Sequence, residues 1–316
     1  MKFPITILPK LMNPGMSNAQ YPHCFATTYF HGQQLIAYGS SNNVIIATRS
    51  LSIVTSLKGH PEGTMVTSIA WAPYSGRLSS GSTDNRIFIW EPVSSVGWTL
   101  SQEIKINSPP VCLSWSHCDH KFCVCSDVVT IYQREDIPDP STGLCAIHPI
   151  WIDPIKATFC SHSRDSRFIL VLQANTRTIV IYHKIQQSNS YCRINISQPS
   201  PVKNVRWRTT DNIHERCCFF TLGDDMAVRI WTETSVNEKL MFNVVAAIPG
   251  CYETVFTAFV TKTTRMVTNN PMIFQQIHRP KSDTYAYGHG HFPLRDRDDR
   301  EAKLLDQSEL EQKHQN

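Results

Sequence analysis

The sequence predicts an all-β fold assembled from repeated units, and three observations lead to that prediction. Short runs rich in valine, isoleucine, threonine and aromatic residues occur throughout the chain, separated by serine, asparagine, aspartate, glycine and proline. Apolar residues at helical spacing are hard to find before residue 290. Strand-like stretches of similar sequence also recur at a nearly constant interval.

The interval identifies the repeated unit. The stretches VTSIAW, VCLSW, IKATF and VKNVRW begin at residues 66, 111, 155 and 202, so they are 45, 44 and 47 residues apart. A further strand candidate, HCFATTYF, lies one interval before the first of them. A period near 45 in a chain of short strands is typical of the four-stranded blade of a β-propeller. We therefore predict about five recognisable blades, in a propeller that is incomplete because five units fall short of the usual seven.

The second unit contains the clearest polar pattern. Gly59-His60 precedes its first strand, Ser80 lies on the second strand, Asp84 lies in the next turn, and Trp90 ends the third strand. These residues resemble the WD40 repeat family, in which the matching side chains form a hydrogen-bonded chain across the blade. A buried indole N–H and a buried imidazole both need partners, so this network would fix the register of the strands. We expect these residues to be structural rather than catalytic.

The other units depart from this pattern. The fifth unit keeps Asp225 and Trp231 at the same spacing of six residues, without a Gly-His pair before them. The remaining units have other residues at the matching positions, namely Asn42 and Thr48 in the first, Tyr132 in the third and Tyr182 in the fourth. We expect these units to be held together more by apolar packing than by a polar network.

One cluster of possible metal ligands falls in the third unit. It consists of His117, Cys118, His120, Cys123 and Cys125. Zinc sites usually combine one close pair of ligands with a second pair further along the chain, and this spacing does not supply it. Cys123 and Cys125 would share one face of a strand as apolar filler. In the tail, His289 and His291 belong to a glycine-rich segment. We therefore predict no metal site and no cofactor.

Signatures of catalysis are also missing from the sequence. There is no G-x-S-x-G elbow, no G-x-x-x-x-G-K-[ST] loop and no G-x-G-x-x-G loop. The stretch SHSRDS contains Ser, His and Asp, but it falls in a predicted hairpin turn. We therefore predict that the protein is not an enzyme.

Nucleic-acid binding is not expected either. The net charge of +4 is too small to predict it from electrostatics. Arg206 and Arg208 flank Trp207, which could suggest a surface for base stacking. On a strand, however, the tryptophan points away from both arginines, so we predict a core tryptophan with two outward arginines that could contact an acidic protein partner.

Cysteine content and hydropathy bear on the compartment. The chain has 11 cysteines, and its opening MKFPITILPKLMNPG lacks the uninterrupted apolar segment of a secretory leader. No stretch approaches 18 consecutive apolar residues. We therefore expect reduced thiols, a cytoplasmic location, no transmembrane segment and at most peripheral association with a membrane.

The units divide the chain into four parts. Residues 1–21 form a lead-in and residues 22–250 form the propeller. Residues 251–281 contain VFTAFV and TRMV, which predict weak extra strands. Residues 282–316 are strongly charged, and we expect a flexible, disordered tail.

Several stretches carry a closer resemblance. MNPG, LIAYGSSNNVIIAT, PSPVKNVRWRTTDNIHERCCFFTLGDDMAVRIWTET and FNVVAAIPG together resemble the N-terminal propeller of the rabconnectin/DmX-like family, over roughly residues 12–250. That family includes the large subunit of the fungal RAVE complex. The resemblance implies a scaffold that binds other RAVE subunits and peripheral-sector subunits of the vacuolar proton-ATPase, and promotes assembly of that pump at vacuolar or endosomal membranes. Family members are much longer, so we expect a truncated product or a shortened relative.

Two other functions stay open at this point. One is an unrelated WD-repeat adaptor, such as a substrate receptor of a ubiquitin ligase. The other is a propeller that acts as an enzyme or binds RNA. Only the partners of the protein distinguish the first of these from the RAVE-type scaffold, because all such propellers share the same repeat.

Overall fold

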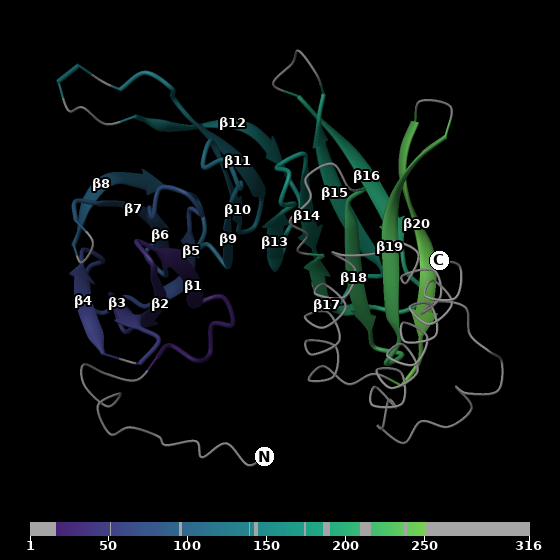
Figure 1. The fold of residues 1–316 in the computed structure, drawn as a ribbon, viewed down its shortest axis with the longest axis horizontal. Coiled ribbons are helices and arrows are strands. Elements are labelled where there is room, and N and C mark those ends of the chain that lie inside the picture. The colour runs from purple at the N-terminus through teal and green to yellow at the C-terminus, as the bar shows by residue number, and fades with distance from the viewer. Residues whose placement is uncertain are drawn as a thin grey trace, which may run out of the picture.

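Five four-stranded antiparallel sheets follow one another along the chain (Figure 1). The computed structural model describes residues 17–250, apart from residues 51, 95–96, 139, 142–144, 174, 186–189, 209–215 and 237–238. The all-β prediction is confirmed, since every regular element in this part of the chain is a strand. The predicted strands of 251–281, the tail of 282–316 with His289 and His291, and most of the lead-in lie outside the described residues.

Each sheet is one blade, and its strands pair in chain order. The first blade comprises β1 (Phe25–Phe30), β2 (Gln33–Ser40), β3 (Asn43–Thr48) and β4 (Ile53–Lys58). The second comprises β5 (Val66–Trp71), β6 (Leu78–Ser82), β7 (Arg86–Pro92) and β8 (Trp98–Lys105). The third comprises β9 (Cys112–Trp115), β10 (Lys121–Cys125), β11 (Val129–Arg134) and β12 (Ile147–Asp153). The fourth comprises β13 (Phe159–His162), β14 (Phe168–Leu172), β15 (Thr178–Lys184) and β16 (Tyr191–Ser197). The fifth comprises β17 (Val202–Trp207), β18 (Cys218–Gly223), β19 (Val228–Val236) and β20 (Lys239–Ile248).

A shift in strand register recurs between the third and fourth strands of the blades. It lies at Ile46/Ala47, Ile89/Trp90, Ile131/Tyr132 and Ile230/Trp231 in the first, second, third and fifth blades. A bulge of this kind bends the strand and increases its twist. The second blade also corrects one prediction, because β7 continues past Trp90 to Pro92 and the tryptophan lies inside the strand rather than at its end.

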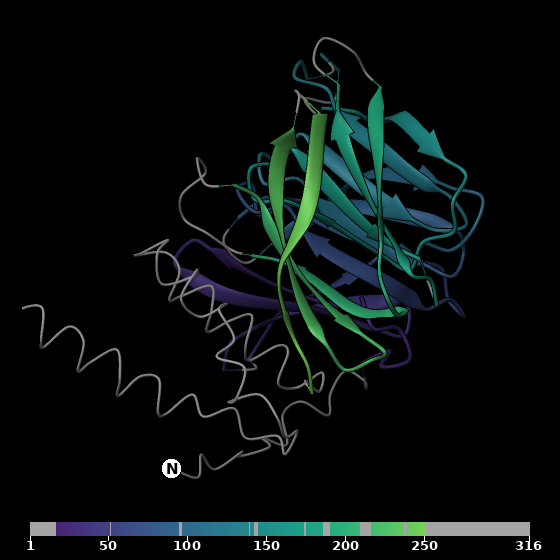
Figure 2. The same cartoon turned by 90° about the vertical axis from the view of Figure 1, so that its right-hand side faces the viewer.

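The hydrophobic core lies between neighbouring blades. Each of four apolar clusters takes its side chains from two consecutive sheets, so that each of the first four blades is buried against the next. The first strands of consecutive blades are in contact, β5 with β1, β9 with β5 and β13 with β9. Figure 1 shows the resulting curved succession of sheets, and Figure 2 shows the same sheets from the side. Sheets with apolar residues on both faces need a neighbour on each side, which explains why the runs seen in the sequence are so apolar.

Turns divide the blades into two faces. In an antiparallel meander the first and third turns lie at one end of the blade, and the second turn lies at the other end with the connection to the next blade. We call these ends the odd-turn face and the even-turn face. Left-handed backbone at the second turns accounts for four of the positive φ angles, at Ser41, Asn85, Asn175 and Met226.

The last residue of the first strand joins its blade to the preceding one. The indole nitrogen of Trp115 donates to the hydroxyl of Ser79 at 3.1 Å, and that of Trp207 donates to the carbonyl oxygen of Ser161 at 2.9 Å. The fourth blade has His162 at this position, and its Nδ1 lies 3.0 Å from the Ser114 hydroxyl of the third blade. A ring nitrogen that reaches back to the previous blade is therefore a repeated feature of the fold.

Candidate functional site

The polar network predicted for the second blade is assembled from three of its elements. His60 lies in the connection before β5, Ser80 lies on β6 and Trp90 lies on β7. The indole nitrogen of Trp90 donates to the Ser80 hydroxyl at 2.9 Å, and His60 Nε2 lies 2.9 Å from the same hydroxyl. Since Ser80 accepts from the indole, its own proton is available for His60 Nε2, which leaves the ring proton on Nδ1. All three side chains are buried.

Asp84 is placed beside this network. Its Oδ1 lies 3.9 Å from His60 Nδ1, which is beyond hydrogen-bond distance, and its Oδ2 lies 3.2 Å from Arg86 Nε. Burial lowers the pKa of His60 to about 4, an effect that the Asp84 charge only partly opposes. His60 is therefore neutral at pH 7 and its ring packs in parallel on Phe88, with 4.3 Å between centroids. These contacts favour a structural role for His60 and Asp84 over a catalytic one.

The fifth blade has a related network with one different member. Trp231 donates to the Thr221 hydroxyl at 3.2 Å, and that hydroxyl donates to Gln198 Oε1 at 3.4 Å. Gln198 therefore occupies the place of His60, although a search for a Gly-His pair does not find it. In the sequence, this role of Gln198 is indicated only by its position, 23 residues before Thr221. The sequence predicted Asp225 as a member of this network, but its carboxylate pairs with Arg229, which lowers the pKa of Asp225 to about 2.

The two predicted partner-contact arginines lie at the end of β17. Trp207 is buried, whereas Arg206 is exposed and Arg208 is half-buried just beyond the strand. The Arg206 guanidinium lies 5.3 Å from the centroid of the Phe159 ring on the neighbouring blade. The tryptophan thus belongs to the core, and the contact of these arginines with a partner stays a prediction.

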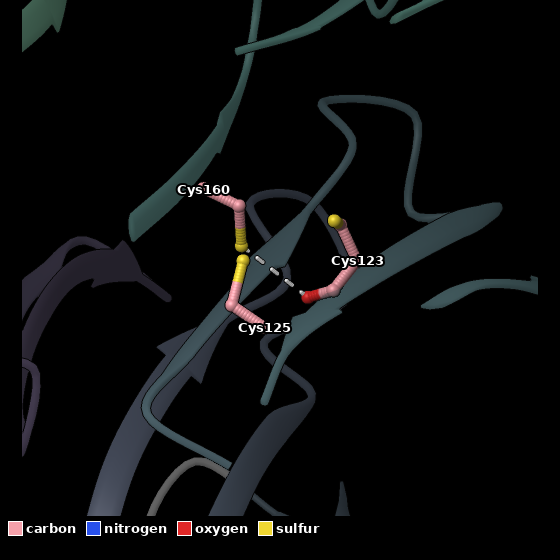
Figure 3. Close-up of side chains that lie close together, drawn as sticks. All are labelled: Cys123, Cys125 and Cys160. Carbon is pink, nitrogen blue, oxygen red and sulfur yellow. Dashed lines mark hydrogen bonds between the residues drawn. The ribbon is translucent and has the colours of Figure 1, made fainter. Parts of the chain in front are cut away.

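The predicted ligand cluster of the third blade is divided by the fold. His117 packs its ring on Tyr74, and His120 pairs with Asp136 at 3.2 Å. Cys118 is exposed in the turn. Cys123 and Cys125 are buried on β10, where a third thiol approaches them from the next blade, that of Cys160 on β13 (Figure 3). Cys160 is far from this cluster in the chain, so the spacing of neighbouring ligands does not reveal it.

The stretch SHSRDS forms a link between blades. The Ser163 hydroxyl donates to Asp165 at 2.5 Å, and the Asp165 carboxylate also accepts from the Arg167 side chain. Arg167 in turn reaches Glu233 on the fifth blade with two hydrogen bonds of 2.7 Å. His162 instead lies against Ser114, so the Ser, His and Asp of this stretch do not form a catalytic triad.

First turns of successive blades are joined on the odd-turn face. Asp119 of the third blade accepts hydrogen bonds from the backbone N–H groups of Tyr74 and Ser75 in the second, at 3.1 and 2.6 Å. Ser166 of the fourth blade accepts from the N–H of His117 in the third, at 2.9 Å. The Asp119 side chain is buried although it lies in a turn. These bonds hold the three turns in a fixed relative position.

Large apolar side chains are exposed on the same face. Residues of this kind at the first and third turns, or within three positions of them, are Tyr29, Ile53, Tyr74, Val93, Leu100, Ile137, Ile185 and Met241. The two most exposed in turns are Ile137 at 79% and Tyr74 at 71%. Fewer lie near the even-turn face, namely Phe25, Val111 and Ile152. Exposed aromatic and aliphatic side chains on a fixed backbone are a typical feature of protein-binding surfaces.

A groove of about 670 Å³ separates the outer strands of the fourth and fifth blades. Its walls come mainly from β16 and β20, with Arg193 and Asn195 on one side and Leu240 and Phe242 on the other. Arg193 also contacts Asp153 at 3.4 Å. The groove mixes polar and apolar walls and brings no catalytic set of side chains together. In the described part of the chain, no helix has the length and hydropathy needed to cross a membrane.

Comparison with known families bears on the second blade. Residues 51–91 match the family WD40, described as "WD domain, G-beta repeat". The match includes His60, Ser80, Asp84 and Trp90, and therefore the whole network of that blade.

Two relatives share the name "Intraflagellar transport protein 122 homolog". The protein of Danio rerio is 24% identical over 215 residues, and that of Mus musculus is 25% identical over 215 residues. The alignments cover 67% of this chain, but only 15% and 16% of the relatives. The chain thus spans a small part of the length of the curated relatives it matches.

A solved structure shows the fold. It is the "Crystal structure of Myceliophteria_thermophila Cps50 (Swd1) beta-propeller domain", with a TM-score of 0.51 and 14% sequence identity. The superposition covers 74% of this chain and 72% of that one. The five sheets are therefore the blades of a WD40-type β-propeller.

Proposed function

We propose that this propeller is a non-enzymatic scaffold that binds other proteins through its odd-turn face. The observation behind this proposal is the group of exposed apolar side chains on that face, placed on turns that are joined from blade to blade. Tyr74 shows the arrangement best. Its backbone is held by Asp119, its ring packs on His117 with 5.0 Å between centroids, and 71% of its surface is exposed.

A fixed aromatic side chain favours binding because little conformational freedom is lost when a partner covers it. Aromatic residues are also enriched among the residues that dominate protein–protein affinity. The hydroxyl–indole networks of the second and fifth blades are each buried within their own blade, so they support the blades and leave recognition to the turns.

For the partners, we infer subunits of the vacuolar proton-ATPase peripheral sector and of the RAVE complex. The support is the resemblance of LIAYGSSNNVIIAT and of the segment from PSPVKNVRW to RIWTET to the rabconnectin/DmX-like family. The first segment forms β2 and β3, and the second forms β17 to β19. A role in pump assembly would place the protein in the cytoplasm, peripherally attached to vacuolar or endosomal membranes.

A second candidate is a role in intraflagellar transport. It is favoured by the similarity over 215 residues to the proteins named as intraflagellar transport protein 122 homologues. At 23–25% identity over 67% of this chain, the similarity supports shared architecture better than shared partners. We rank this role below pump assembly, and a generic adaptor such as a ubiquitin-ligase substrate receptor below both.

Affinity capture distinguishes these functions. The full chain, tagged at its N-terminus, is recovered from cells of the source organism, and the bound proteins are quantified by mass spectrometry. Enrichment of proton-pump subunits is the expected result. Enrichment of intraflagellar transport subunits would favour the second role, and enrichment of cullin-associated adaptors would favour the generic adaptor. RNA in the eluate that is lost at high salt would contradict the scaffold proposal.

A further inference from the structure

Buried thiols from two blades meet between the third and fourth blades. Cys123 and Cys125 are two positions apart on β10, so both side chains lie on the same side of the sheet. Cys160 approaches them from β13, as Figure 3 shows. The three sulfur atoms lie within 4.8 Å of one another. Their residues are at most 2% exposed, so water does not solvate these sulfurs.

Cys112 adds a fourth thiol beside this group. It lies directly across from Cys125 in the β9–β10 pair, so its side chain is on the same side of the sheet. The Cys160 backbone N–H donates to Cys112 Sγ at 3.4 Å, and the Cys112 thiol lies 3.6 Å from the Cys160 carbonyl oxygen. The Cys112 sulfur lies outside the group of three sulfurs within 4.8 Å of one another, but it contacts Cys160 at the edge of that group.

Two polar atoms, one on a residue of the same apolar cluster and one on the same strand as Cys160, have no hydrogen-bond partner within the described segments. One is the hydroxyl of Tyr191, which belongs to the same apolar cluster as the cysteines. The other is Nε2 of His162, two positions after Cys160 and on the same side of β13. Both residues are more than nine-tenths buried, and simple apolar packing does not account for unpaired polar atoms here.

We propose that Cys123, Cys125 and Cys160 bind a single zinc ion, with Cys112 as the fourth ligand. Thiolates are the preferred ligands of structural zinc, and a set of four sulfurs suits its tetrahedral geometry. At a zinc–sulfur distance of about 2.3 Å, tetrahedral sulfurs lie about 3.8 Å apart. The three grouped sulfurs would therefore move slightly closer together on binding, and the Cys112 side chain would turn toward them. The divalent charge offsets two of the four thiolate charges, which lowers the cost of burying them in the dry interface.

Binding is a proton exchange without a redox step. Each coordinating thiol releases its proton to solvent, and a lone pair of the resulting thiolate forms the bond to the metal, whose oxidation state does not change. The ligands come from the third and fourth blades, so the ion would join them across their shared core. Because the thiols are buried in the folded protein, the ion enters while the blades assemble. The site lies inside the fold and is independent of the proposed docking face.

Metal content and spectroscopy test the site in the full chain. The protein is produced in zinc-supplemented medium, purified, and analysed by inductively coupled plasma mass spectrometry. It is also unfolded, refolded with Co²⁺, and examined for the visible absorption bands of cobalt bound to thiolates in tetrahedral geometry. We expect close to one zinc ion per chain and an intense cobalt–thiolate spectrum. A folded wild-type protein that holds no zinc and gives no such spectrum would overturn the proposal.

Matched variants locate the metal. Cys125→Ala and Cys160→Ala should weaken zinc binding at least about tenfold, the loss expected even from an outer partner of a metal ligand. Cys192→Ala is the control, because Cys192 is exposed on β16. Equal metal loss in the control would contradict the site. So would a Cys125–Cys160 disulfide, detected by mass spectrometry in protein purified under reducing conditions.

A core-filling variant separates zinc binding from packing. Cys125→Val keeps an apolar side chain of similar size in the interface. If the thiols only fill space, the zinc chelator changes the melting temperature of neither this variant nor the wild type. If they bind zinc, chelation before refolding lowers the melting temperature of the wild type and leaves that of Cys125→Val unchanged.

Discussion

Thr221 occupies in the fifth blade the place that Ser80 occupies in the second. Each hydroxyl accepts a hydrogen bond from a tryptophan ten residues further along the chain, Trp231 at 3.2 Å and Trp90 at 2.9 Å. The second partner of each hydroxyl differs, because His60 contacts Ser80 whereas Gln198 contacts Thr221. The hydroxyl–indole pair is thus the common element of the two blades, and the group that precedes it can change from imidazole to amide.

Removal of the central hydroxyl should destabilise the second blade more than the fifth. Ser80→Ala leaves both the Trp90 N–H and His60 Nε2 without a partner, and each orphaned group costs about 1–3 kcal/mol. Thr221→Val orphans mainly the Trp231 N–H, because the bond to Gln198 is long at 3.4 Å. Urea denaturation of the two variants measures the difference, with the exposed Ser50→Ala as the control. Equal losses in Ser80→Ala and Thr221→Val would show that the imidazole adds no stability.

Contacts within a blade were the most predictable part of this structure. The spacing of His60, Ser80, Asp84 and Trp90 in the sequence predicts their proximity, because strands that pair in order place residues of one repeat side by side. The interval of about 45 residues likewise predicts five units, and five sheets are present in the described part of the chain. The register shift beside Trp90 was not predictable, since a bulge depends on how the strand twists against its neighbour.

Contacts between blades were harder to predict, because they join residues a full repeat apart. Cys112 and Cys160 are separated by 48 residues, as are Ser114 and His162. Alignment of the units places such residues at similar positions, so a partial signal was present. Whether their side chains meet depends on the packing angle of the two sheets, which the sequence pattern does not contain. Gln198 was missed for another reason, since an amide replaced the expected imidazole.

Acid should destabilise the protein through His60. Its pKa is about 4 in the folded state against 6.5 for an exposed histidine, so the unfolded chain binds more protons between these values. The stability due to a neutral His60 is therefore complete above pH 6.5 and is lost as the pH falls toward 4. Near pH 5 the loss relative to pH 7 is about 2 kcal/mol, measurable by urea denaturation.

His60→Gln is the matched variant for this test, because glutamine is the residue that the fifth blade has at the same place. It removes the titrating group and should give a flatter dependence of stability on pH. His162 is still present in this variant. Burial lowers its pKa to about 3, so it should cause a remaining loss of stability in acid. An unchanged pH dependence in His60→Gln would exclude His60 as the cause.

Asp119 should stabilise the odd-turn face through two backbone hydrogen bonds. Asp119→Ala leaves the N–H groups of Tyr74 and Ser75 without their acceptor, and we expect a loss of about 2 kcal/mol. Asp119→Asn keeps one carbonyl oxygen and should lose less. Asp136→Ala is the control, since this carboxylate is exposed and, among the described residues, pairs with the exposed His120. Thermal unfolding of the three variants checks the order, and an Asp119→Ala melting temperature equal to that of the control would contradict it.

Exposed apolar residues of the odd-turn face should affect partner binding without affecting stability. Tyr74→Ala and Ile137→Ala remove side chains that are 71% and 79% exposed, so the free energy of unfolding should change by less than about 0.5 kcal/mol. If this face binds the partners, either substitution should reduce their recovery in affinity capture, and the double variant should reduce it by at least about tenfold. Ile152→Ala is the matched control, because Ile152 is 58% exposed near the even-turn face. Loss of partners in the control, with full recovery by the odd-turn variants, would assign binding to the opposite face.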